Sequence, residues 1–370
     1  MKKIFCFFLI FILASTAYCQ TKTNKEEFKA NNDTAFDKGS NIKFGEITQE
    51  KLNDLSLLGM VWGFLKYYHP NIAKGDYNWD YELFRILPKF LQSKNNVDRD
   101  NILVNWVKSL GITEPDNEKK DTTEKKAEIK LNPDLYWIEH INLSADIVYV
   151  LTNVKNAKRN DKQYYVALGL RAGNPIFKNE KGFTDMKYPD AGFRLLSLYR
   201  YWNIIQYYYP YKNLIEEDWK GVLKELIPTF INAKNEIEYK LAVLELMARV
   251  HDTHSNILGQ DEALTKYRGA NVAAVQIKFV ENKVVVIDYY DNDLGSKTGL
   301  HPGDVITKLN GRTIKQILDE KLKYTPASNY PTQLRDIAKL MLQTNDSTMS
   351  IEFIRNGKTQ SLVINTYPTS

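Results

Sequence analysis

The chain has 370 residues, of which 43% are hydrophobic and 12% aromatic, so it can fill two or three domain cores and is not largely disordered. Fifty Lys and Arg side chains against 45 Asp and Glu give a net charge of only +5, which does not indicate a nucleic-acid-binding protein. Both cysteines, Cys6 and Cys19, lie near the start, which excludes a disulfide framework, a cysteine metal site and a cysteine nucleophile from the rest of the chain.

The first residues have the pattern of a secretory signal. Lys2 and Lys3 precede an apolar run, residues 4–14, which is too short to cross a membrane. We predict a signal peptide over residues 1–19, cleaved after Ala17 or after Cys19. Lipidation of Cys19 is the alternative, which the bulky tyrosine before it disfavours. We therefore expect an exported protein, periplasmic or extracellular, with no transmembrane span. The polar segment 20–45 is predicted to be a flexible lead-in.

The chain resembles itself at an offset of 140 residues, without a gap. Two tryptophans recur at this spacing, Trp62 with Trp202 and Trp79 with Trp219, and tryptophan is too rare for chance to explain both. We interpret this as duplication of a helical unit, with two independently similar helix pairs as the alternative. The other matched pairs are Leu58/Leu198, Tyr67/Tyr207, Tyr68/Tyr208, Pro70/Pro210, Leu83/Leu223, Pro88/Pro228, Phe90/Phe230, Lys94/Lys234 and Asn95/Asn235.

Each copy is predicted to contain helices joined by short turns. In the second copy the helix over residues 193–209 ends at Pro210, because proline lacks the amide hydrogen and clashes with the preceding turn. Apolar residues at helical spacing predict third helices over residues 97–110 and 237–248. The expected units are an N-terminal helical domain with a mixed α/β part over residues 46–190 and a second helical unit over residues 191–265.

The segment between the copies has a different character. Residues 114–130 are a charge run predicted to be a mobile loop. Two β-branched or aromatic runs, residues 147–154 and 164–170, are predicted to be strands. Residues 169–189, with their Gly, Asn and Pro, are predicted to be irregular.

The last hundred residues have the pattern of a small β-rich module. Strands are predicted over residues 272–280 and 283–290, a further strand at 307–309 and a helix over residues 333–342. A final hairpin, residues 349–354 and 359–365, turns at Asn356-Gly357.

This module resembles a PDZ domain of the bacterial, circularly permuted order. The resemblance rests on Gly299-Leu300-His301-Pro302-Gly303-Asp304-Val305-Ile306, the Asn310-Gly311 turn and the late helix and hairpin, and it covers residues 268–368. It implies that an extended peptide pairs with the strand edge at residues 272–279 and packs on the late helix. A PDZ fold that only spaces domains is the alternative. The residues expected to bind peptide are Gly269, Ala270, Asn271, Val272, Ala274, Leu334 and Ile337, the first three at a terminal carboxylate. The expected fold class is therefore α+β, a duplicated helical region followed by a circularly permuted PDZ-like domain.

The sequence contains five histidines. We expect a structural or surface role for His69, His140 and His301. His251 and His254 lie together in His-Asp-Thr-His-Ser, directly after a predicted helix. Three interpretations are open. The pair could bind a metal, although no third ligand is indicated, it could be a polar cap without function, or one histidine could be the general base for a hydroxyl nucleophile elsewhere.

The stretch Asp-Thr-His-Ser, residues 252–255, directly before a permuted PDZ domain resembles the carboxy-terminal-processing/tricorn-core family of serine peptidases. Lys-Tyr-Tyr-His-Pro (66–70), Phe-Arg-Leu-Leu (193–196) and the aromatic stretch 201–211 look like exported Bacteroidetes-type members. In the tricorn-like branch a Ser-His pair supplies the catalytic histidine. That pair falls on Thr253 and His254, with Thr in place of Ser, so the resemblance implies that His254 is the base and leaves the role of Thr253 open.

In this family the nucleophilic serine and the oxyanion hole lie in an α/β domain after the PDZ domain, and the sequence contains no Gly-x-Ser-x-Gly motif. We therefore expect the N-terminal and PDZ portion of an exported serine peptidase, inactive by itself. A stand-alone exported peptide-binding scaffold is the alternative. No cofactor or metal is expected. The expected partners are peptides or the carboxy-terminal segments of proteins, and a homo-oligomer is left open.

Overall fold

The computed structural model describes residues 28–116, 133–159, 163–171, 173–257 and 259–369. The predicted signal peptide lies outside these residues, and so does most of the predicted loop over residues 114–130. The described part of the predicted lead-in contacts the helices. Phe36 contacts Tyr81 and Phe84 with ring centroids 5.5 and 5.4 Å apart, and the Ser40 hydroxyl donates to Asp190 at 2.5 Å. Phe36 and Ser40 therefore anchor this polar segment to the helices.

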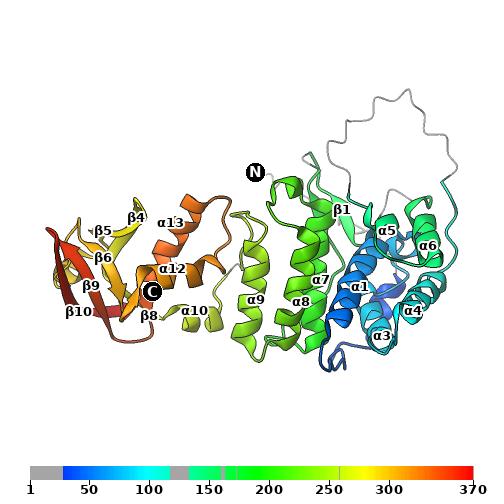
Figure 1. Cartoon of the computed structure of the whole chain (residues 1–370), viewed down its shortest axis with the longest axis horizontal. Coiled ribbons are helices and arrows are strands. Elements are labelled where there is room, and N and C mark those ends of the chain that lie inside the picture. The colour runs from blue at the N-terminus through cyan, green and yellow to red at the C-terminus, as the bar shows by residue number, and fades with distance from the viewer. Residues whose placement is uncertain (1–27, 117–132, 160–162, 172, 258, 370) are drawn as a thin grey trace, which may run out of the picture.

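Helices and antiparallel strands separate along the chain, as in the α+β class predicted. A helical part is followed by a sheet-rich part that lies beside its last helices, and each has its own hydrophobic core (Figure 1). The helical part contains η1 (Lys29–Asn32), α1 (Gln49–Tyr68), α2 (Pro70–Ala73), α3 (Trp79–Leu91), α4 (Asn96–Ser109), α5 (Trp137–His140), α6 (Ala145–Lys155), α7 (Ala191–Tyr208), η2 (Lys212–Leu214), α8 (Trp219–Asn232), α9 (Glu236–Ala248) and α10 (Glu262–Arg268).

The two copies of the helical unit have the same internal geometry. In the first, the indole N–H of Trp62 donates to the carbonyl of Trp79 at 3.0 Å, and Trp79 donates back to Trp62 at 2.9 Å. In the second, Trp202 and Trp219 make the same reciprocal bonds at 2.7 and 3.2 Å. The third helices begin alike as well, because Asn95 and Asn235 each cap a helix N-terminus by accepting the N–H three residues on, both at 2.9 Å. This shared geometry supports duplication over independent origin.

The first helices of the two copies pack side by side and run in the same direction. Equivalent positions face each other over three successive turns: 59 with 199, 63 with 203, and 67 with 207. The close approach depends on glycine in α1. A Cβ on Gly63 would lie 1.7 Å from the Asn203 side chain, and one on Gly59 would lie 2.7 Å from the Tyr199 ring. Equivalent residues that face each other on parallel helices indicate an approximate two-fold axis parallel to those helices, and the reciprocal contacts of α1 with α8 and of α7 with α3 agree with it.

The segment between the copies differs from its prediction at residues 147–154, which are not a strand but part of α6. The buried side chains Ile147, Val150, Leu151 and Val154 follow helical spacing, so their packing overrides the β propensity of the branched residues. The predicted strand over 164–170 is present in part as β1 (Val166–Leu168). It pairs with β2 (Pro175–Phe177), a strand inside the segment predicted to be irregular.

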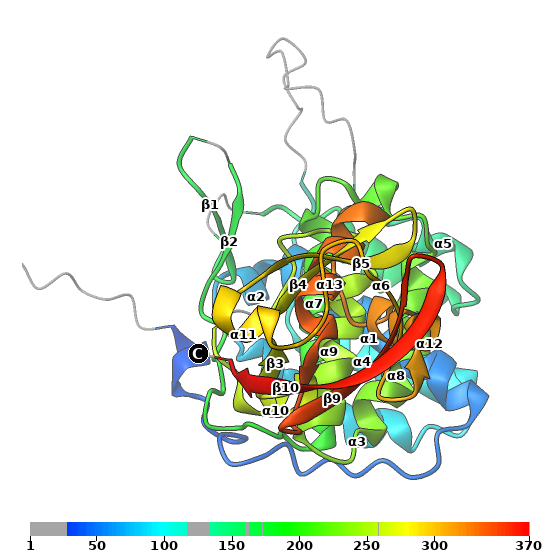
Figure 2. The same ribbon diagram turned by 90° about the vertical axis from the view of Figure 1, so that its left-hand side faces the viewer.

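The sheet-rich part is built on one curled antiparallel sheet with the strand order β4-β5-β6-β9-β10-β3-β8 (Figure 2). The single strand predicted over residues 272–280 is two strands, β3 and β4, which lie far apart in this order and are separated at Ala274. The elements are β3 (Asn271–Ala273), β4 (Val275–Val280), β5 (Lys283–Tyr289), α11 (Asn292–Ser296), β6 (Val305–Leu309), β7 (Arg312–Thr313), α12 (Ile314–Leu322), α13 (Tyr330–Met341), β8 (Gln343–Thr344), β9 (Thr348–Arg355) and β10 (Lys358–Pro368).

Several local features of this part were predicted correctly. Asn310-Gly311 and Asn356-Gly357 both have positive φ angles, as tight hairpin turns require. The predicted helix over 333–342 is α13, and the final hairpin is β9 and β10. Helix α12 was missed, although Thr313 and Gln316 form a capping box at its start. Among the described residues, no helix is long and apolar enough to cross a membrane.

Candidate functional site

The segment His251–Ser255 leaves α9 and reverses direction at once, because His251 has a positive φ of 54°. Asp252 then closes a small turn: its Oδ1 accepts the His254 backbone N–H at 2.9 Å and lies 3.0 Å from His254 Nδ1. A carboxylate can only accept, so Nδ1 carries the hydrogen and Nε2 is the acceptor of the neutral ring. The His254 side chain is 96% exposed. The sequence motif brings a histidine and an orienting carboxylate together, and the sequence reasoning had missed this role of Asp252.

Thr253, the other predicted catalytic residue, points to a different partner. Its N–H donates to the Ser328 hydroxyl at 3.1 Å, its Oγ1 lies 2.8 Å from the Ser328 hydroxyl, and the Ser328 N–H donates to Oγ1 at 3.0 Å. Ser328 lies between α12 and α13, so Thr253 ties the segment to the sheet-rich part. A second tie comes from α7, where the Tyr201 hydroxyl donates to the Ser255 hydroxyl at 3.0 Å. Burial raises the pKa of Tyr201 to about 12, so it remains a donor at neutral pH.

His69 lies apart from this segment, between α1 and α2. His69 is buried, and its Nδ1 accepts the Asn71 N–H at the start of α2. Burial lowers its pKa to about 4, so it is neutral near pH 7. His251 Nε2 lies 3.6 Å from Glu217. Within the described residues, no three His, Cys, Asp or Glu side chains are arranged to hold a metal ion, so the His-x-x-His alternative gains no third ligand here.

The predicted carboxylate-binding residues are already occupied by internal contacts. The Gly269 N–H donates to the Thr265 carbonyl at 2.9 Å, and the Ala270 N–H donates to Asn345 Oδ1 at 3.2 Å. Asn271 and Val272 belong to β3, which has β10 on one side and β8 on the other. The prediction of an open strand edge is therefore wrong for β3. The residues predicted to form one strand form two strands, which divide at Ala274.

The remaining predicted peptide contacts flank an edge that is open in the described sheet. Strand β4 ends the strand order, with β5 on one side and helix α13 packed beside it. Ala274 is buried, and its carbonyl accepts the Tyr290 N–H at 3.0 Å. Leu334 and Ile337 lie on the buried face of α13, and Ile337 is fully buried in the core. The structure thus places Leu334 and Ile337 near β4, whereas Gly269 to Val272 make internal contacts elsewhere.

The sequence also contains one Ser-x-x-Lys spacing, Ser40-x-x-Lys43, a pattern in which serine can act as a nucleophile. Ser40 is only 1% exposed, and its hydroxyl donates to the Asp190 carboxylate while accepting the Ile42 N–H at 3.1 Å. Asp190 is the N-cap of α7. These contacts give Ser40 a structural role in attaching the lead-in to the helices.

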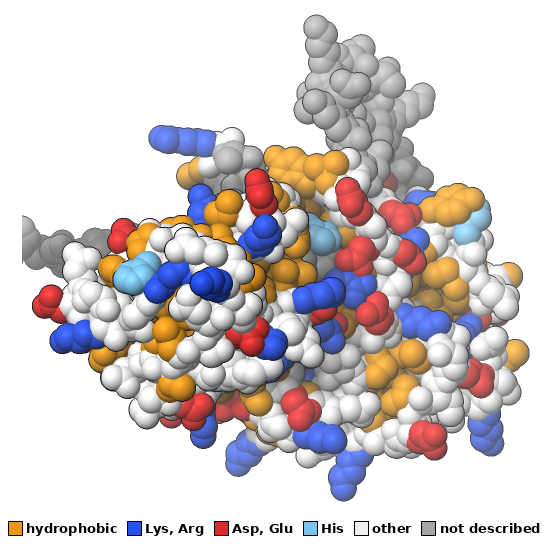
Figure 3. Space-filling model, turned by 60° about the vertical axis from the view of Figure 1, so that its left-hand side comes forward, with side chains coloured by type: hydrophobic (Ala, Val, Ile, Leu, Met, Phe, Trp, Pro, Cys, Tyr) orange, Lys and Arg blue, Asp and Glu red, His pale blue; other side chains and the backbone are white. Residues whose placement is uncertain are grey.

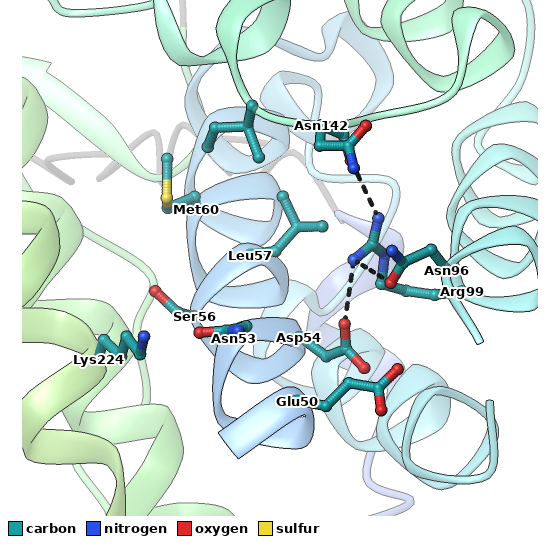
Figure 4. A pocket seen from close by; sticks show the side chains of 11 residues that line it. Glu50, Asn53, Asp54, Ser56, Leu57, Met60, Asn96, Arg99, Asn142 and Lys224 are labelled. Atoms are coloured by element: carbon teal, nitrogen blue, oxygen red, sulfur yellow. Dashed lines mark hydrogen bonds and ion pairs between the residues drawn. The ribbon is translucent and has the colours of Figure 1, made fainter. Parts of the chain in front are cut away.

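A separate cavity of about 600 Å³ lies where α1, α4 and α8 meet (Figure 4). At its wall, the buried Arg99 donates to Asp54 and Asn96, both at 3.1 Å, and to Asp100 at 2.7 and 2.9 Å. Arg99 also reaches the Asn142 carbonyl at 3.4 Å, so each of its guanidinium nitrogens already has an acceptor. None of the five histidines lines this cavity. The charged cluster around Arg99 is thus satisfied by its own hydrogen bonds.

The comparisons with known proteins are sparse. No protein-family model matches the sequence, and no curated protein matches it. Among solved structures, the chain is similar to a photosystem II D1 C-terminal processing protease, with 17% identity and a TM-score of 0.26. The similar region covers 48% of this chain and 44% of that one, so it spans less than half of the protease. A likeness this distant carries no argument about activity.

Proposed function

We propose that this chain is the N-terminal and PDZ portion of an exported serine peptidase that cleaves peptides or unfolded proteins. The observation that carries the proposal is the pair formed by Asp252 and His254. A carboxylate that holds Nδ1–H fixes the tautomer in which Nε2 can take a proton from a hydroxyl nucleophile. The His254 side chain is exposed, so a reacting group can approach it. Because no family model matches, the support for peptide hydrolysis as the class of reaction is the sequence resemblance to the carboxy-terminal-processing/tricorn-core family.

In the proposed mechanism, His254 Nε2 removes the proton from a serine hydroxyl as the serine oxygen attacks a peptide carbonyl. The imidazolium then gives this proton to the departing amine, and water hydrolyses the acyl-enzyme by the same exchange. The serine and the oxyanion-hole donors are proposed to belong to a further α/β domain outside residues 1–370. Asp252 stabilises the imidazolium, and Thr253 positions the segment.

The peptide-binding module of the proposal is a PDZ domain of the circularly permuted order. Its support is strand β4 at the end of the sheet with α13 beside it, the arrangement in which an extended peptide adds as a further strand. Backbone hydrogen bonds to β4 would hold the peptide, and side chains of α13 would select it. The carboxylate site is proposed to lie after Ala274 rather than at Gly269 and Ala270, whose N–H groups are taken.

The test is hydrolysis of an unfolded protein by the longest product of the reading frame, purified unchanged and with single substitutions. His254→Ala should lower kcat at least about 1,000-fold, because the base that activates the nucleophile is lost. Asp252→Asn should also lower kcat strongly, through the wrong tautomer. His301→Ala is the control and should retain full activity. Undiminished hydrolysis by His254→Ala would exclude the proposed role of this histidine.

Export is part of the proposal and rests on residues 1–19. Amino-terminal sequencing of the mature protein should find an N-terminus directly after Ala17 or Cys19. A chain that retains Met1, or a lipid-modified Cys19, would contradict soluble export.

A stand-alone peptide-binding scaffold is the second candidate function. The open edge of β4 favours it, since strand addition there does not require His254. Calorimetry on the present chain should then show micromolar binding of peptides with a free carboxy-terminus and weaker binding of their amidated forms. No binding across a diverse peptide set would count against both the scaffold and the peptide-binding part of the peptidase.

A further inference from the structure

The hairpin of β1 and β2 projects from the helical part as an arm (Figure 2). Its base is anchored: Tyr165 and Val166 are buried, and Phe177 packs on Tyr208 with ring centroids 5.4 Å apart. Its end is closed by the Gly169 N–H, which donates to the Asn174 carbonyl at 2.8 Å. Among the described strands, β1 and β2 pair only with each other. An arm of two strands is only marginally stable without a further partner surface.

The outer part of the arm carries large apolar side chains in the open. Leu168 is 70% exposed, Leu170 is 96% exposed and Ile176 is 51% exposed. The register pairs Leu168 with Pro175 on one face and Ala167 with Ile176 on the other. Apolar side chains therefore cover both faces and the end of the arm. This suits immersion in an apolar layer better than docking on a flat protein surface, which would cover one face.

The charge of the arm has one sign. The sequence from 166 to 178 contains Arg171 and Lys178 and no acidic residue, and both cations are exposed. Elsewhere acidic and basic side chains are interspersed, as the face drawn in Figure 3 shows. Exposed leucines beside cations are the combination that holds a segment at an anionic lipid surface.

We infer that this arm binds the surface of a membrane that contains anionic phospholipid. Leu168, Leu170 and Ile176 enter the boundary between headgroups and acyl chains, and Arg171 and Lys178 contact the phosphates. The open strand edges limit how deeply the arm can enter the membrane, because unpaired backbone groups cannot be buried in hydrocarbon. The inference does not depend on the proposed peptidase activity.

The experiment is co-sedimentation of the chain with vesicles of neutral phosphatidylcholine, or of the same lipid with about one third phosphatidylglycerol. Two surface cations should make binding to the anionic vesicles about 10- to 30-fold tighter, and raising the salt concentration should reverse this gain. Equal binding to both kinds of vesicle, or binding to neither, would overturn the inference.

Variants locate the contact. The triple substitution Leu168→Ser, Leu170→Ser, Ile176→Ser should lower vesicle binding at least about 10-fold at an unchanged melting temperature, because these side chains are outside the core. Val363→Ser, which removes an apolar side chain that is 68% exposed on β10, is the matched control and should bind like the unchanged protein. Sedimentation that shows a dimer abolished by the triple substitution would assign the arm to a second copy of the chain and overturn the lipid assignment.

Discussion

Thr253 and Ser328 exchange three hydrogen bonds although 75 residues separate them in the sequence. The candidate base His254 follows the first of these residues, and Asn329, the N-cap of α13, follows the second. The helix beside the β4 edge and the candidate catalytic segment are therefore fastened to each other at their ends. Lys323 and Glu245 form a further link between the two parts, with 3.1 Å between nitrogen and oxygen.

Removing the Ser328 hydroxyl should loosen this junction. Ser328→Ala deletes the acceptor of the Thr253 N–H, so amide exchange at Thr253 should speed up, and the free energy of unfolding should fall by about 0.5–1.5 kcal/mol. Exchange within β9 and β10 should not change. Ser361→Ala, on an exposed part of β10, is the control. Unaltered exchange at Thr253 in the Ser328 variant would show that the junction is not closed in solution.

The close packing of α1 on α7 predicts a strong effect of one methyl group. Gly63→Ala forces a Cβ into the buried Asn203 side chain, which is itself held by hydrogen bonds to the Gly59 and Tyr199 carbonyls at 3.0 and 2.8 Å. The free energy of unfolding should fall by about 2–3 kcal/mol in chemical denaturation, although alanine is the better helix former.

Gly45→Ala is the matched control, because a Cβ there meets nothing within 4 Å. It should leave stability unchanged to within about 0.5 kcal/mol. A Gly63 variant as stable as this control would mean that the two helices are further apart than described.

The contribution of the reciprocal tryptophan hydrogen bonds to stability can be tested by comparison with a buried tryptophan whose indole N–H makes no such bond. Trp62→Phe and Trp202→Phe each remove an indole N–H that donates to a buried carbonyl, so each should cost about 1–3 kcal/mol more than the loss of ring area alone. Trp106 is buried and stacked on Trp79, but its indole N–H has no partner among the described residues. Trp106→Phe should therefore cost less than either, and equal costs for all three would contradict the hydrogen-bonding role.

His69 predicts a pH dependence of stability. Its pKa is about 4 in the folded protein, because burial disfavours the charged ring, against 6.5 when exposed. The unfolded chain therefore binds the proton first, and stability falls as the pH drops from about 6.5 to about 4. The full loss is about 3 kcal/mol and is complete below that range. His69→Asn, which keeps an acceptor for the α2 cap, should flatten this slope, whereas His301→Asn should not.

The two helical copies could be predicted from the sequence because the repeated residues make equivalent contacts in each copy. Within each pair, the two tryptophans donate hydrogen bonds to each other's backbone carbonyls. Both tryptophans must therefore recur at the same spacing for the helices of the second copy to pack in the same way. Prediction from the sequence failed where tertiary packing decides the outcome. Residues 147–154 contain enough branched side chains for a strand, but the face they bury has helical spacing. The division at Ala274 carries no local mark, since both halves have strand composition.

Part of the candidate site could also be read in advance. The spacing of Asp252 and His254 was visible, but their contact depends on the reversal at His251, a non-glycine residue with positive φ that no sequence pattern signals. The role of Thr253 could not be read, because Ser328 is distant in sequence and the segment before α13 has no predicted structure. The capping box at Thr313 and Gln316 was readable and would have revealed α12.

Because the first helices of the two copies face each other, the outer side of each copy is formed by its third helix, α4 in the first and α9 in the second. The segment between the copies covers one outer side, where α6 covers α4. At the other outer side α10 and Lys323 cover α9, the counterpart of α4. The insertion between the repeats and the module after them thus cover the two equivalent outer sides of the pair. The duplicated unit therefore presents a different surface on each side, although the helices covered there are counterparts.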